Sequence, residues 1–405
     1  MAKRLDYINF LPEELLITNI FTRLPAKSVG RCKCVSKPWY SLISSSGPDF
    51  VQAHLAKTTI SKLALISVLS DPGVLYSVPF CYDYRYNYKN PNCKNFVMNY
   101  CSRMEGKRET KTKLIFNVPN KWYKVWGSCD GLILVQEKQA GTSLFVLNPT
   151  TLESRKLPDM PKCFFGKACN VFGFGYDFSR DDYAVVVISD RVDYPKVACV
   201  YIFMLKTKQW EKVGVSPYAY KHQRRVGGVV LKGCLHWLTE KSTIIAAYDI
   251  AKREFSGVPL PVGILDSSLE FLRLGVLKGC LCLFSNVINN ISELFVMKEY
   301  GVVESWTKLS VVLADVSHVA SLDLLEDRSD FVNSGQSVLL VSSAEKATVH
   351  NSKVLGLPND FRVGMSFIES LVSPNEDGKK KIRAKKSQTI AREYKDDISG
   401  WLMAW

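Results

Sequence analysis

The sequence lacks any apolar run long enough to cross a bilayer. Its longest uninterrupted apolar stretch, Val197 to Leu205, has only the length of a strand. A signal-peptide core is also missing, because Asp6, Glu13 and Glu14 interrupt the apolar residues near the N-terminus. We therefore expect a protein that stays in the cytoplasm, the nucleus or both and has no membrane partner.

Motifs for metal binding, disulfides and catalysis are missing too. The five histidines and twelve cysteines are dispersed, and the close cysteine pairs have C-x-C rather than C-x-x-C spacing. The chain contains no P-loop, no G-x-S-x-G elbow and no H-E-x-x-H motif. Gly173-Phe-Gly175 is half a dinucleotide fingerprint and is better explained as a pair of glycines on an edge strand. His236 alternates with apolar neighbours, which is typical of a buried, hydrogen-bonded histidine on a strand. The sequence thus predicts no catalytic residue, no cofactor and no metal.

Acidic residues are outnumbered by basic ones, 39 against 53, which gives a formal net charge of +14. Six of the eight residues from Lys379 to Lys386 are basic, and elsewhere the two signs are mixed. This run is either a solvated tail or a nuclear-import signal. It has no interleaved aromatic residues for stacking on bases, so the pattern does not favour nucleic acid as a partner.

Residues 8 to 56 have the apolar spacing of three short helices that are separated by proline. The first starts at Leu11-Pro12-Glu13-Glu14 and ends at Pro25, and the third follows Pro38. Helices of this size without metal or disulfides do not enclose a sufficient core, so we expect them to pack on the rest of the chain or to dock on another protein. Their apolar positions are Leu16, Ile17, Ile20, Phe21 and Leu24; Val29, Cys32 and Val35; and Trp39, Leu42 and Ile43.

From about residue 60 to 370, short alternating apolar segments are separated by Gly, Pro, Asp and Asn, which indicates strands. Examples are Gly131 to Val135, Tyr183 to Ile188 and Val338 to Val341. The segment Val230-Leu-Lys-Gly-Cys-Leu235 recurs letter for letter at Val276 to Leu281, 46 residues later. Gly131-Leu-Ile-Leu134 stands roughly two such periods before the first copy.

A second repeated element follows the first. It is an apolar strand, a polar turn and a strand that opens with a bulky residue. It occurs at 144–158, 201–213, 246–255 and 294–309. Four strands in a repeat of this length predict the blades of a propeller, although the sequence does not fix their number. An irregular sandwich with one chance repeat is the alternative.

The predicted fold class is α+β and multidomain. Residues 1–56 form the small helical domain, and residues 57–372 form a mainly β, propeller-like domain that is interrupted by a long insertion at Tyr82 to Lys113. Residues 373–405 form a basic tail that we expect to be poorly ordered.

The helical segment resembles an F-box, and the region after it resembles the plant F-box-associated interaction domain, which is related to kelch repeats. The F-box positions are Leu11-Pro12-x-Glu14-Leu15, Arg23-Leu24-Pro25, Ser28, Arg31, Cys34-Val35-Ser36-Lys37, Trp39 and Leu42-Ile43. The positions of the associated domain are Gly127-Ser-Cys-Asp-Gly-Leu132, Asn148-Pro149-Thr150, Gly173-Phe-Gly-Tyr-Asp177 and Phe367-Ile-Glu-Ser-Leu371.

The resemblance implies a non-catalytic substrate-recognition subunit of an SCF-type ubiquitin ligase. Its F-box would bind a Skp-type adaptor and through it a cullin-RING ligase. The second domain would hold an unidentified target protein, and the result would be target ubiquitination and proteasomal degradation. The implied adaptor-binding residues are Leu11, Pro12, Leu15, Ile20, Leu24, Pro25, Val29, Cys32, Val35, Trp39 and Leu42.

Gly30 and Cys32 stand where the family has large apolar residues. A glycine within a helix costs about 1 kcal/mol relative to alanine, which predicts weaker adaptor binding. A propeller scaffold whose degenerate F-box no longer recruits the ligase is therefore the alternative function. A kelch-type oxidase is a third, but its His, Tyr and Cys metal ligands have no recognisable counterpart here. Target-binding residues cannot be assigned, and the candidate loops are Asp190 to Lys196, Tyr218 to Arg225 and Ile288 to Ser292.

Overall fold

The computed structural model describes the helices and strands given below with their short turns. The contacts divide the chain into the units Met1–Asn375 and Glu376–Trp405, and all described residues belong to the first. Most of the predicted insertion and the tail beyond Asn375 lie outside the described residues. The described residues are 12, 15–45, 47–58, 61–67, 73–79, 112–115, 122–137, 143–160, 169–190, 198–220, 227–240, 244–262, 264, 272–277, 279–286, 291–312, 319–323, 329–334, 337–342, 349–352 and 361–375.

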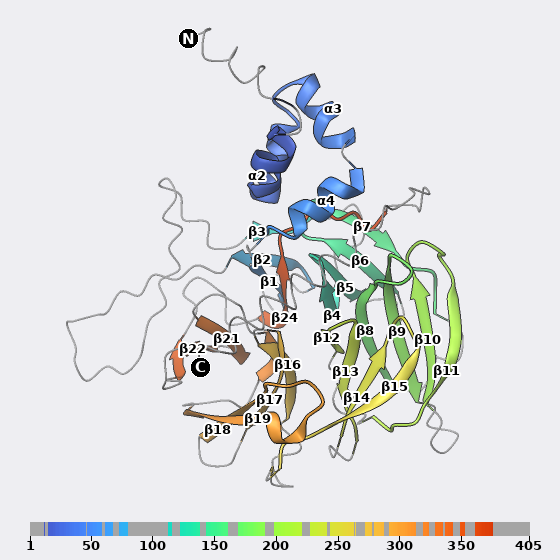
Figure 1. Ribbon diagram of the computed structural model, residues 1–405, viewed down its shortest axis with the longest axis vertical. Helices are drawn as coiled ribbons and strands as arrows, with labels where there is room; N and C mark the ends of the chain where they lie inside the picture. The colour runs from blue at the N-terminus through green and yellow to red at the C-terminus, as the bar shows by residue number, and fades with distance from the viewer. Residues whose placement is uncertain are drawn as a thin grey trace, which may run out of the picture. The chain divides into compact units, whose positions relative to one another are not determined.

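The chain begins with a helical module, as predicted (Figure 1). Pro25 separates its first two segments, because its extended backbone (ψ 143°) does not continue a helix. Pro38 lies in the first turn of the next helix, where its missing N–H costs no hydrogen bond. The predicted apolar positions end at Ile43, so they did not indicate the last helix, which follows it. The elements are the π-helical turn η3 Leu16–Ile20, the 3-10 turn η4 Phe21–Arg23, α2 Ala26–Cys32, α3 Lys37–Ser45 and α4 Gly47–Leu55.

The first predicted helix departs from α-helical geometry. The backbone N–H of Phe21 donates to the carbonyl of Leu16, five residues earlier, so this turn is wider than an α-helical one. Leu16 and Phe21 therefore share one face, as the predicted apolar stripe requires, and are 6% and 1% exposed. Ile20 was predicted on the same face but lies on another face of the turn and is 39% exposed.

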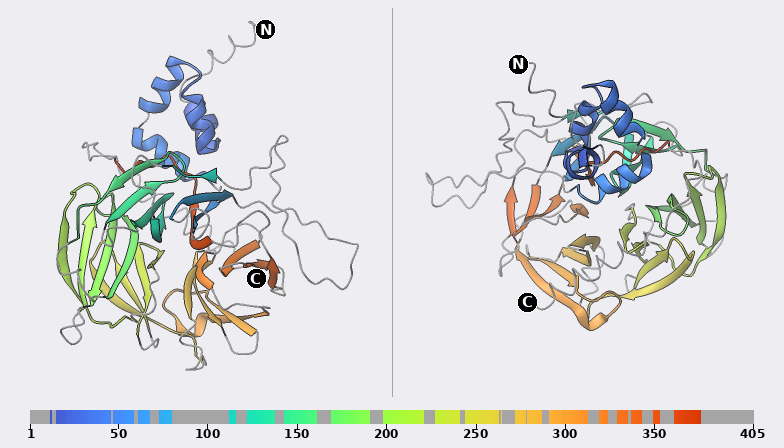
Figure 2. Two further views of the ribbon diagram at one scale, coloured as in Figure 1. Left: turned by 180° about the vertical axis from the view of Figure 1, so that it is seen from behind. Right: turned by 45° about the horizontal axis from the view of Figure 1, so that its top comes forward.

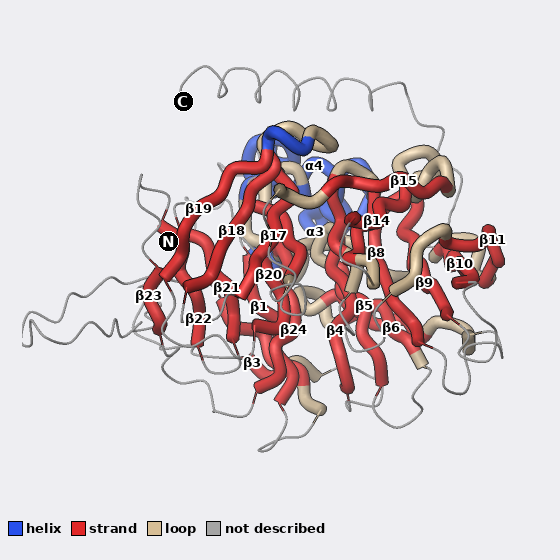
Figure 3. The backbone as a smooth tube through the Cα atoms, turned by 90° about the horizontal axis from the view of Figure 1, so that it is seen from below, coloured by secondary structure: helices blue, strands red, loops and turns tan. Residues whose placement is uncertain are grey.

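Antiparallel meanders make up the rest of the described chain, which confirms the predicted β domain (Figure 3). The first three meanders in chain order are β4 Trp122–Cys129, β5 Leu132–Glu137, β6 Leu144–Asn148 and β7 Glu153–Lys156; β8 Cys169–Asp177, β9 Asp182–Asp190, β10 Ala198–Met204 and β11 Trp210–Ser216; and β12 Val229–Leu231, β13 Cys234–Leu238, β14 Ile244–Asp249 and β15 Glu254–Pro259.

The other three meanders include strands from both ends of the β domain. Two of them form one eight-stranded sheet, because β16 and β20 pair in parallel over two residues. These meanders are β16 Arg273–Leu277, β17 Cys280–Asn286, β18 Ile291–Met297 and β19 Trp306–Val312, with the 3-10 turn η7 Val303–Ser305; β20 Val319–Asp323, β21 Ser329–Ser334, β22 Ser337–Ser342 and β23 Val349–Ser352; and β24 Phe361–Ile368, β1 Ser61–Ser67, β2 Leu75–Pro79 and β3 Thr112–Lys113.

The meanders close into a propeller. The first strand of each meander contacts the first strand of the next, in the order β24, β4, β8, β12, β16, β20 and back to β24. Figure 2 (right) shows the sheets following one another in this way. The described strands thus form six blades, a number that the sequence left open. One blade is completed by the C-terminal β24, which pairs with the N-terminal β1 from Ser61↔Ile368 to Ser67↔Phe361.

The two copies of the repeated hexapeptide occupy the same place in successive blades. Each forms the hairpin between the first two strands, with Leu231↔Cys234 as the closing pair in one blade and Leu277↔Cys280 in the next. The turn glycines, Gly233 and Gly279, both have positive φ (76° and 70°). The predicted period of 46 residues is therefore the length of one blade.

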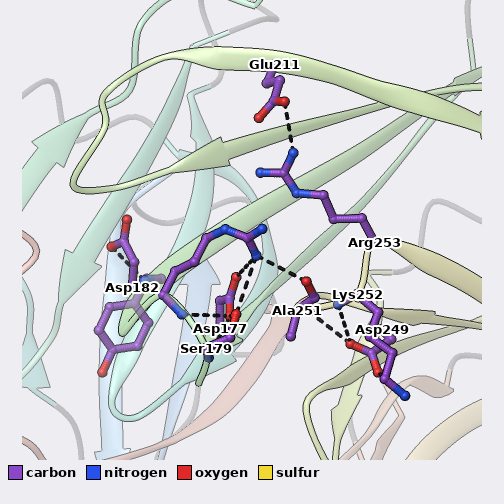
Figure 4. Close-up of polar contacts among 10 residues, drawn as sticks. Asp177, Ser179, Asp182, Glu211, Asp249, Ala251, Lys252 and Arg253 are labelled. Atoms are coloured by element: carbon purple, nitrogen blue, oxygen red, sulfur yellow. Dashed lines mark hydrogen bonds and ion pairs between the residues drawn. The ribbon is translucent and has the colours of Figure 1, made fainter.

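The second repeated element is the outer half of a blade. In two blades, a tryptophan that opens the outer strand joins the blade to the chain that leads into it. The indole N–H of Trp210 donates to the carbonyl of Pro158, and that of Trp306 donates to the carbonyl of Pro259, each at 3.0 Å. The polar turns make further links between blades (Figure 4), since Arg180 donates to the carbonyl of Ala251 at 3.1 Å.

Apolar clusters fill the spaces between neighbouring blades, and two predicted assignments are confirmed there. Gly173 lies on the edge strand β8, where an added Cβ would meet Trp237 of the next blade at 2.7 Å. His236 is fully buried and uses both ring nitrogens: Nδ1 donates to the carbonyl of Val229 (3.2 Å) and Nε2 accepts from the Tyr300 hydroxyl (2.7 Å). Both residues thus belong to the packing of the blades.

Candidate functional site

The helical module exposes an unusual share of apolar surface. Nine large apolar residues are exposed among the residues that the structure describes, and four of them lie in this short module. Large apolar side chains exposed at this density in a short segment indicate a surface for a partner. The four residues and their exposed fractions are Leu15 (45%), Ile20 (39%), Val35 (62%) and Tyr40 (60%).

A small core of its own holds the module together. Val29 is fully buried in it, and Phe21 packs edge-on against Trp39 with 5.1 Å between ring centroids. Burial of such residues stabilises the module by roughly 1.5 to 3 kcal/mol for each large side chain. The core residues are Leu16, Phe21, Val29, Ile43 and Phe50, with Ile17, Leu24, Cys32, Trp39, Leu42 and Leu371 packed against them.

The predicted adaptor-binding residues fall into three groups. Pro12, Leu15, Ile20, Pro25 and Val35 are exposed on the module. The partly buried residues, which support the core and keep some surface, are Leu24, Cys32, Trp39 and Leu42.

Val29 makes up the third group and requires a correction. Its side chain has no exposed surface, so in the folded module it supports the site from within and does not touch a partner. Leu11 lies outside the described residues. Tyr40, which was not predicted from the sequence, is 60% exposed, because it lies about 100° around α3 from the partly buried Trp39.

Polar contacts fix the corner between the first turn and α2. The Nε2 atom of His54 donates to the carbonyl of Leu24 at 2.8 Å, and the Lys57 ammonium donates to the Thr22 hydroxyl at 3.0 Å. Both donors lie on or just after α4, which therefore holds the exposed Pro25 in place. Burial lowers the pKa of His54, while its bond to Leu24 and the nearby Glu369 carboxylate oppose this effect.

Gly30 and Cys32 have different consequences in α2. Cys32 packs partly against the core, and burial raises the pKa of its thiol. Gly30 is exposed, and an added Cβ would meet no atom within 4 Å. Gly30 therefore weakens the helix but removes no core contact.

We expect Gly30→Ala to stabilise α2 by about 1 kcal/mol, because alanine loses less backbone entropy in a helix than glycine. Hydrogen exchange of the α2 amides in the full-length chain should slow by about fivefold. Lys27→Ala, at another exposed position of α2, is the matched control and should change exchange by less than about twofold. Exchange that is equal in Gly30→Ala and wild type would contradict the prediction.

The candidate target-binding loops lie mostly outside the described residues, but the topology places their ends. They connect second to third strands, or the outer strand of one blade to the inner strand of the next. In an antiparallel meander such connections share one face of the ring, and the hairpin turns between first and second or third and fourth strands share the other. Their described parts are Asp190, Tyr218 to Tyr220 and Ile291 to Ser292.

Within the part of the chain that the structure describes, no three or more His, Cys, Asp or Glu residues are grouped so that they could hold a metal ion. The helices described are too short or too polar to cross a membrane. Among the described residues, seven cysteines carry free thiols: Cys32, Cys34, Cys129, Cys199, Cys234, Cys280 and Cys282.

Comparisons with known proteins match both parts of the chain. The F-box domain family matches residues 8–50, and the F-box associated beta propeller domain family matches residues 88–363. F-box protein CPR1 of Arabidopsis thaliana is 30% identical over 324 residues, which are 73% of this chain and 72% of that protein. An F-box/kelch-repeat protein of the same plant is 28% identical over 381 residues, which are 90% of this chain and 96% of that protein. Among solved structures, a chain of a nidogen/laminin complex gives a TM-score of 0.43 at 10% identity and covers 76% of this chain and 98% of that chain.

Proposed function

This chain belongs to the F-box proteins that carry an F-box-associated β-propeller domain, and on that premise we propose that it selects a target protein for ubiquitination and proteasomal degradation. The family supports a general role as an SCF substrate adaptor that binds a Skp-type adaptor. The proposal adds that this chain recruits a cullin-RING ligase through that adaptor and catalyses no step itself.

The exposed apolar residues of the folded F-box carry this proposal. Leu15, Ile20 and Val35 are exposed although the module has its own buried core, so they are available to a partner without unfolding. Burying them in a protein interface would remove apolar surface from water at a gain of about 25 cal/mol per Å². A Skp-type adaptor is the partner that an F-box implies.

We propose that the target protein binds the face of the propeller where the longer connections between strands lie. The F-box approaches the other face, because its helix α4 packs near the turns β4–β5 and β6–β7 through residues 369–372. Target and adaptor then do not compete for the same surface. Loops on a rigid scaffold commonly carry such binding functions.

The proposed mechanism is proximity. A receptor that holds both target and ligase converts ubiquitin transfer into a reaction within one complex, which raises the effective concentration of target lysines. This needs no acid, base, nucleophile or metal from the receptor. We further propose that the protein works in the cytoplasm, the nucleus or both, and that neither a membrane nor nucleic acid is a partner.

Capture of a purified Skp-type adaptor by the full-length chain tests the proposal. We expect wild type to bind, and Leu15→Ala combined with Ile20→Ala to bind about tenfold to a hundredfold more weakly, because truncating apolar interface residues costs about 1 kcal/mol or more each. Both side chains are exposed, so the melting temperature should stay unchanged.

The matched control is Val262→Ala, which truncates an apolar residue that is 88% exposed on the propeller. It should bind like wild type. If wild type captures no adaptor, the ligase role fails and a propeller scaffold with a degenerate F-box takes its place.

A further inference from the structure

A short segment directly after β24 joins the F-box to the propeller. We call residues 369–372, Glu369-Ser370-Leu371-Val372, the strap. The strap comes more than 300 residues after the F-box in sequence, yet it lies against both domains. None of its four residues is exposed: Glu369, Ser370 and Val372 are 3%, 0% and 5% exposed, and Leu371 is half-buried.

Side chains of the strap point alternately to the two domains. Leu371 packs against the F-box core, and the Glu369 carboxylate is close enough to influence His54 of α4. Val372 belongs to the apolar cluster between the β4–β7 and β8–β11 blades, and Ser370 lies against the β4–β5 turn. An extended backbone has this two-residue period, so one strand-like segment can serve two faces at once.

Asn148, at the end of β6, fixes the propeller side of the strap. Its Nδ2 atom donates to the carbonyl of Val372 at 2.7 Å and to the carbonyl of Ser370 at 3.1 Å. Its Oδ1 atom accepts from the backbone N–H groups of Thr150 (2.7 Å) and Thr151 (3.2 Å), which shapes the β6–β7 turn. Asn148 is fully buried, so loss of these bonds would leave polar atoms unpaired.

Further contacts continue this attachment on both sides. After the strap, Arg155 of β7 donates to the carbonyl of Pro374 at 3.1 Å. On the F-box side, Val51 and Leu55 of α4 pack directly against the apolar cluster that contains Val372. The strap is thus one layer of a continuous packed junction, with α4 on one side and the β4–β7 blade on the other.

We propose that the strap is a positioning element, which holds the adaptor-binding face of the F-box in a fixed orientation to the propeller. This inference rests on the proposed function. A receptor that recruits a ligase gains from a stiff connection, since flexibility between two binding sites lowers the effective concentration of one near the other. The residues that do this are Asn148, Leu371 and Val372, and none of them needs to touch adaptor or target.

The substitution Asn148→Asp tests the strap with little change in shape. It keeps the Oδ1 acceptor that shapes the turn, but it replaces the Nδ2 donor with an oxygen that faces two carbonyl groups. Asp249 occupies the same place in the β12–β15 blade, where its Oδ1 accepts from the N–H groups of Ala251 and Lys252. Asp249→Asn is therefore the matched control, because it makes the reverse substitution at a turn that the strap does not contact.

Hydrogen exchange of the full-length chain is the first measurement. In Asn148→Asp, amides of α4 and of residues 369–372 should exchange about tenfold faster or more, while those of β9 and β10 stay within about twofold of wild type. Asp249→Asn should leave α4 unchanged. If α4 exchanges in Asn148→Asp as in wild type, the strap does not hold the F-box and the inference is overturned.

Ubiquitin transfer within the assembled ligase is the second measurement. With adaptor, cullin, RING subunit and charged conjugating enzyme, the lysines modified on the receptor itself should form the same restricted set in wild type and Asp249→Asn. A loosened F-box presents the propeller in many orientations, so Asn148→Asp should spread modification over more propeller lysines. An unchanged set, with adaptor capture retained, would contradict a positioning role.

A second variant covers the case that Asn148→Asp does not fold. Leu371→Ala removes only the F-box side of the strap, and it should speed exchange in α4 by about fivefold or more without affecting β9 and β10. If, in both variants, hydrogen exchange speeds up no more in α4 than in β9 and β10, the inference is refuted. Adaptor capture separates the two proposals: if wild type captures none, the ligase role fails, while the exchange data still decide whether the strap fixes the F-box.

Discussion

Gly131→Ala should destabilise the folded chain by several kcal/mol, whereas Gly279→Ala should cost only about 1 to 2 kcal/mol. The two glycines occupy the same position in equivalent hairpins, with φ of 80° and 70°. Both substitutions carry the same backbone penalty, because a residue with a Cβ is strained at positive φ.

The difference arises from the strap. A Cβ at Gly131 would lie 2.6 Å from the carbonyl oxygen of Ile368 and 2.3 Å from the hydroxyl of Ser370, whereas a Cβ at Gly279 would meet no atom within 4 Å. Backbone of β24 cannot move away without disturbing the strand that closes the ring. Gly131→Ala therefore adds a steric clash to the strain that both variants share.

Chemical denaturation of the two variants beside wild type measures the difference. Gly233→Ala adds a third hairpin, with φ of 76° and its nearest contact at 3.7 Å, and it should behave like Gly279→Ala. Equal losses of unfolding free energy in all three variants would mean that Ile368 and Ser370 move away from an added Cβ at no cost, contrary to the packing described above.

Acidification should destabilise the protein through His236. Burial lowers the pKa of this imidazole to about 4, against the hydrogen bonds to the backbone of Val229 and Cys234, which raise it. The unfolded chain binds the proton with an ordinary pKa near 6.5. Protonation thus favours the unfolded chain, so the contribution of His236 to stability is complete above about pH 6.5 and is lost as the pH falls toward 4.

The expected loss from His236 is about 2 kcal/mol between pH 7 and pH 5. His236→Phe, which cannot titrate, should lose correspondingly less stability over the same interval, even though it starts from a lower value. Denaturation at the two pH values in both proteins gives the comparison, and His54, which titrates in the same direction, cancels because both proteins contain it. The same pH dependence in His236→Phe and wild type would show that another group is responsible.

Local patterns in the sequence predicted the elements well. Pro25 and Pro38 mark the helical segments because their effect on the backbone is local. The repeated hexapeptide gives the length of a blade because each copy falls at the same hairpin, where its glycine has positive φ, as seen at Gly233 and Gly279. These features need no knowledge of distant residues.

Features that depend on distant residues or on a change of helical type were not predictable. The number of blades depends on the pairing of β1 with β24, which are about 300 residues apart. The exposure of Ile20 depends on a π-helical turn, whereas the apolar spacing assumed 3.6 residues per turn. The F-box resemblance implied a docking role for Val29, but an apolar helix residue can face either a core or a partner, and only packing decides between them.

The closure of the ring by β24 has a consequence for the order in which the protein becomes functional during synthesis. At about 5 to 20 residues per second, the ribosome needs about 15 to 60 seconds to proceed from β1 to β24. During this time the F-box emerges while the first blade is still incomplete. A message that ends early, between β19 and β24, would therefore produce a chain that still offers Leu15 and Ile20 to the adaptor but has no closed receptor behind them. On the proposed function, such a chain would compete with the intact protein for the adaptor without holding a target.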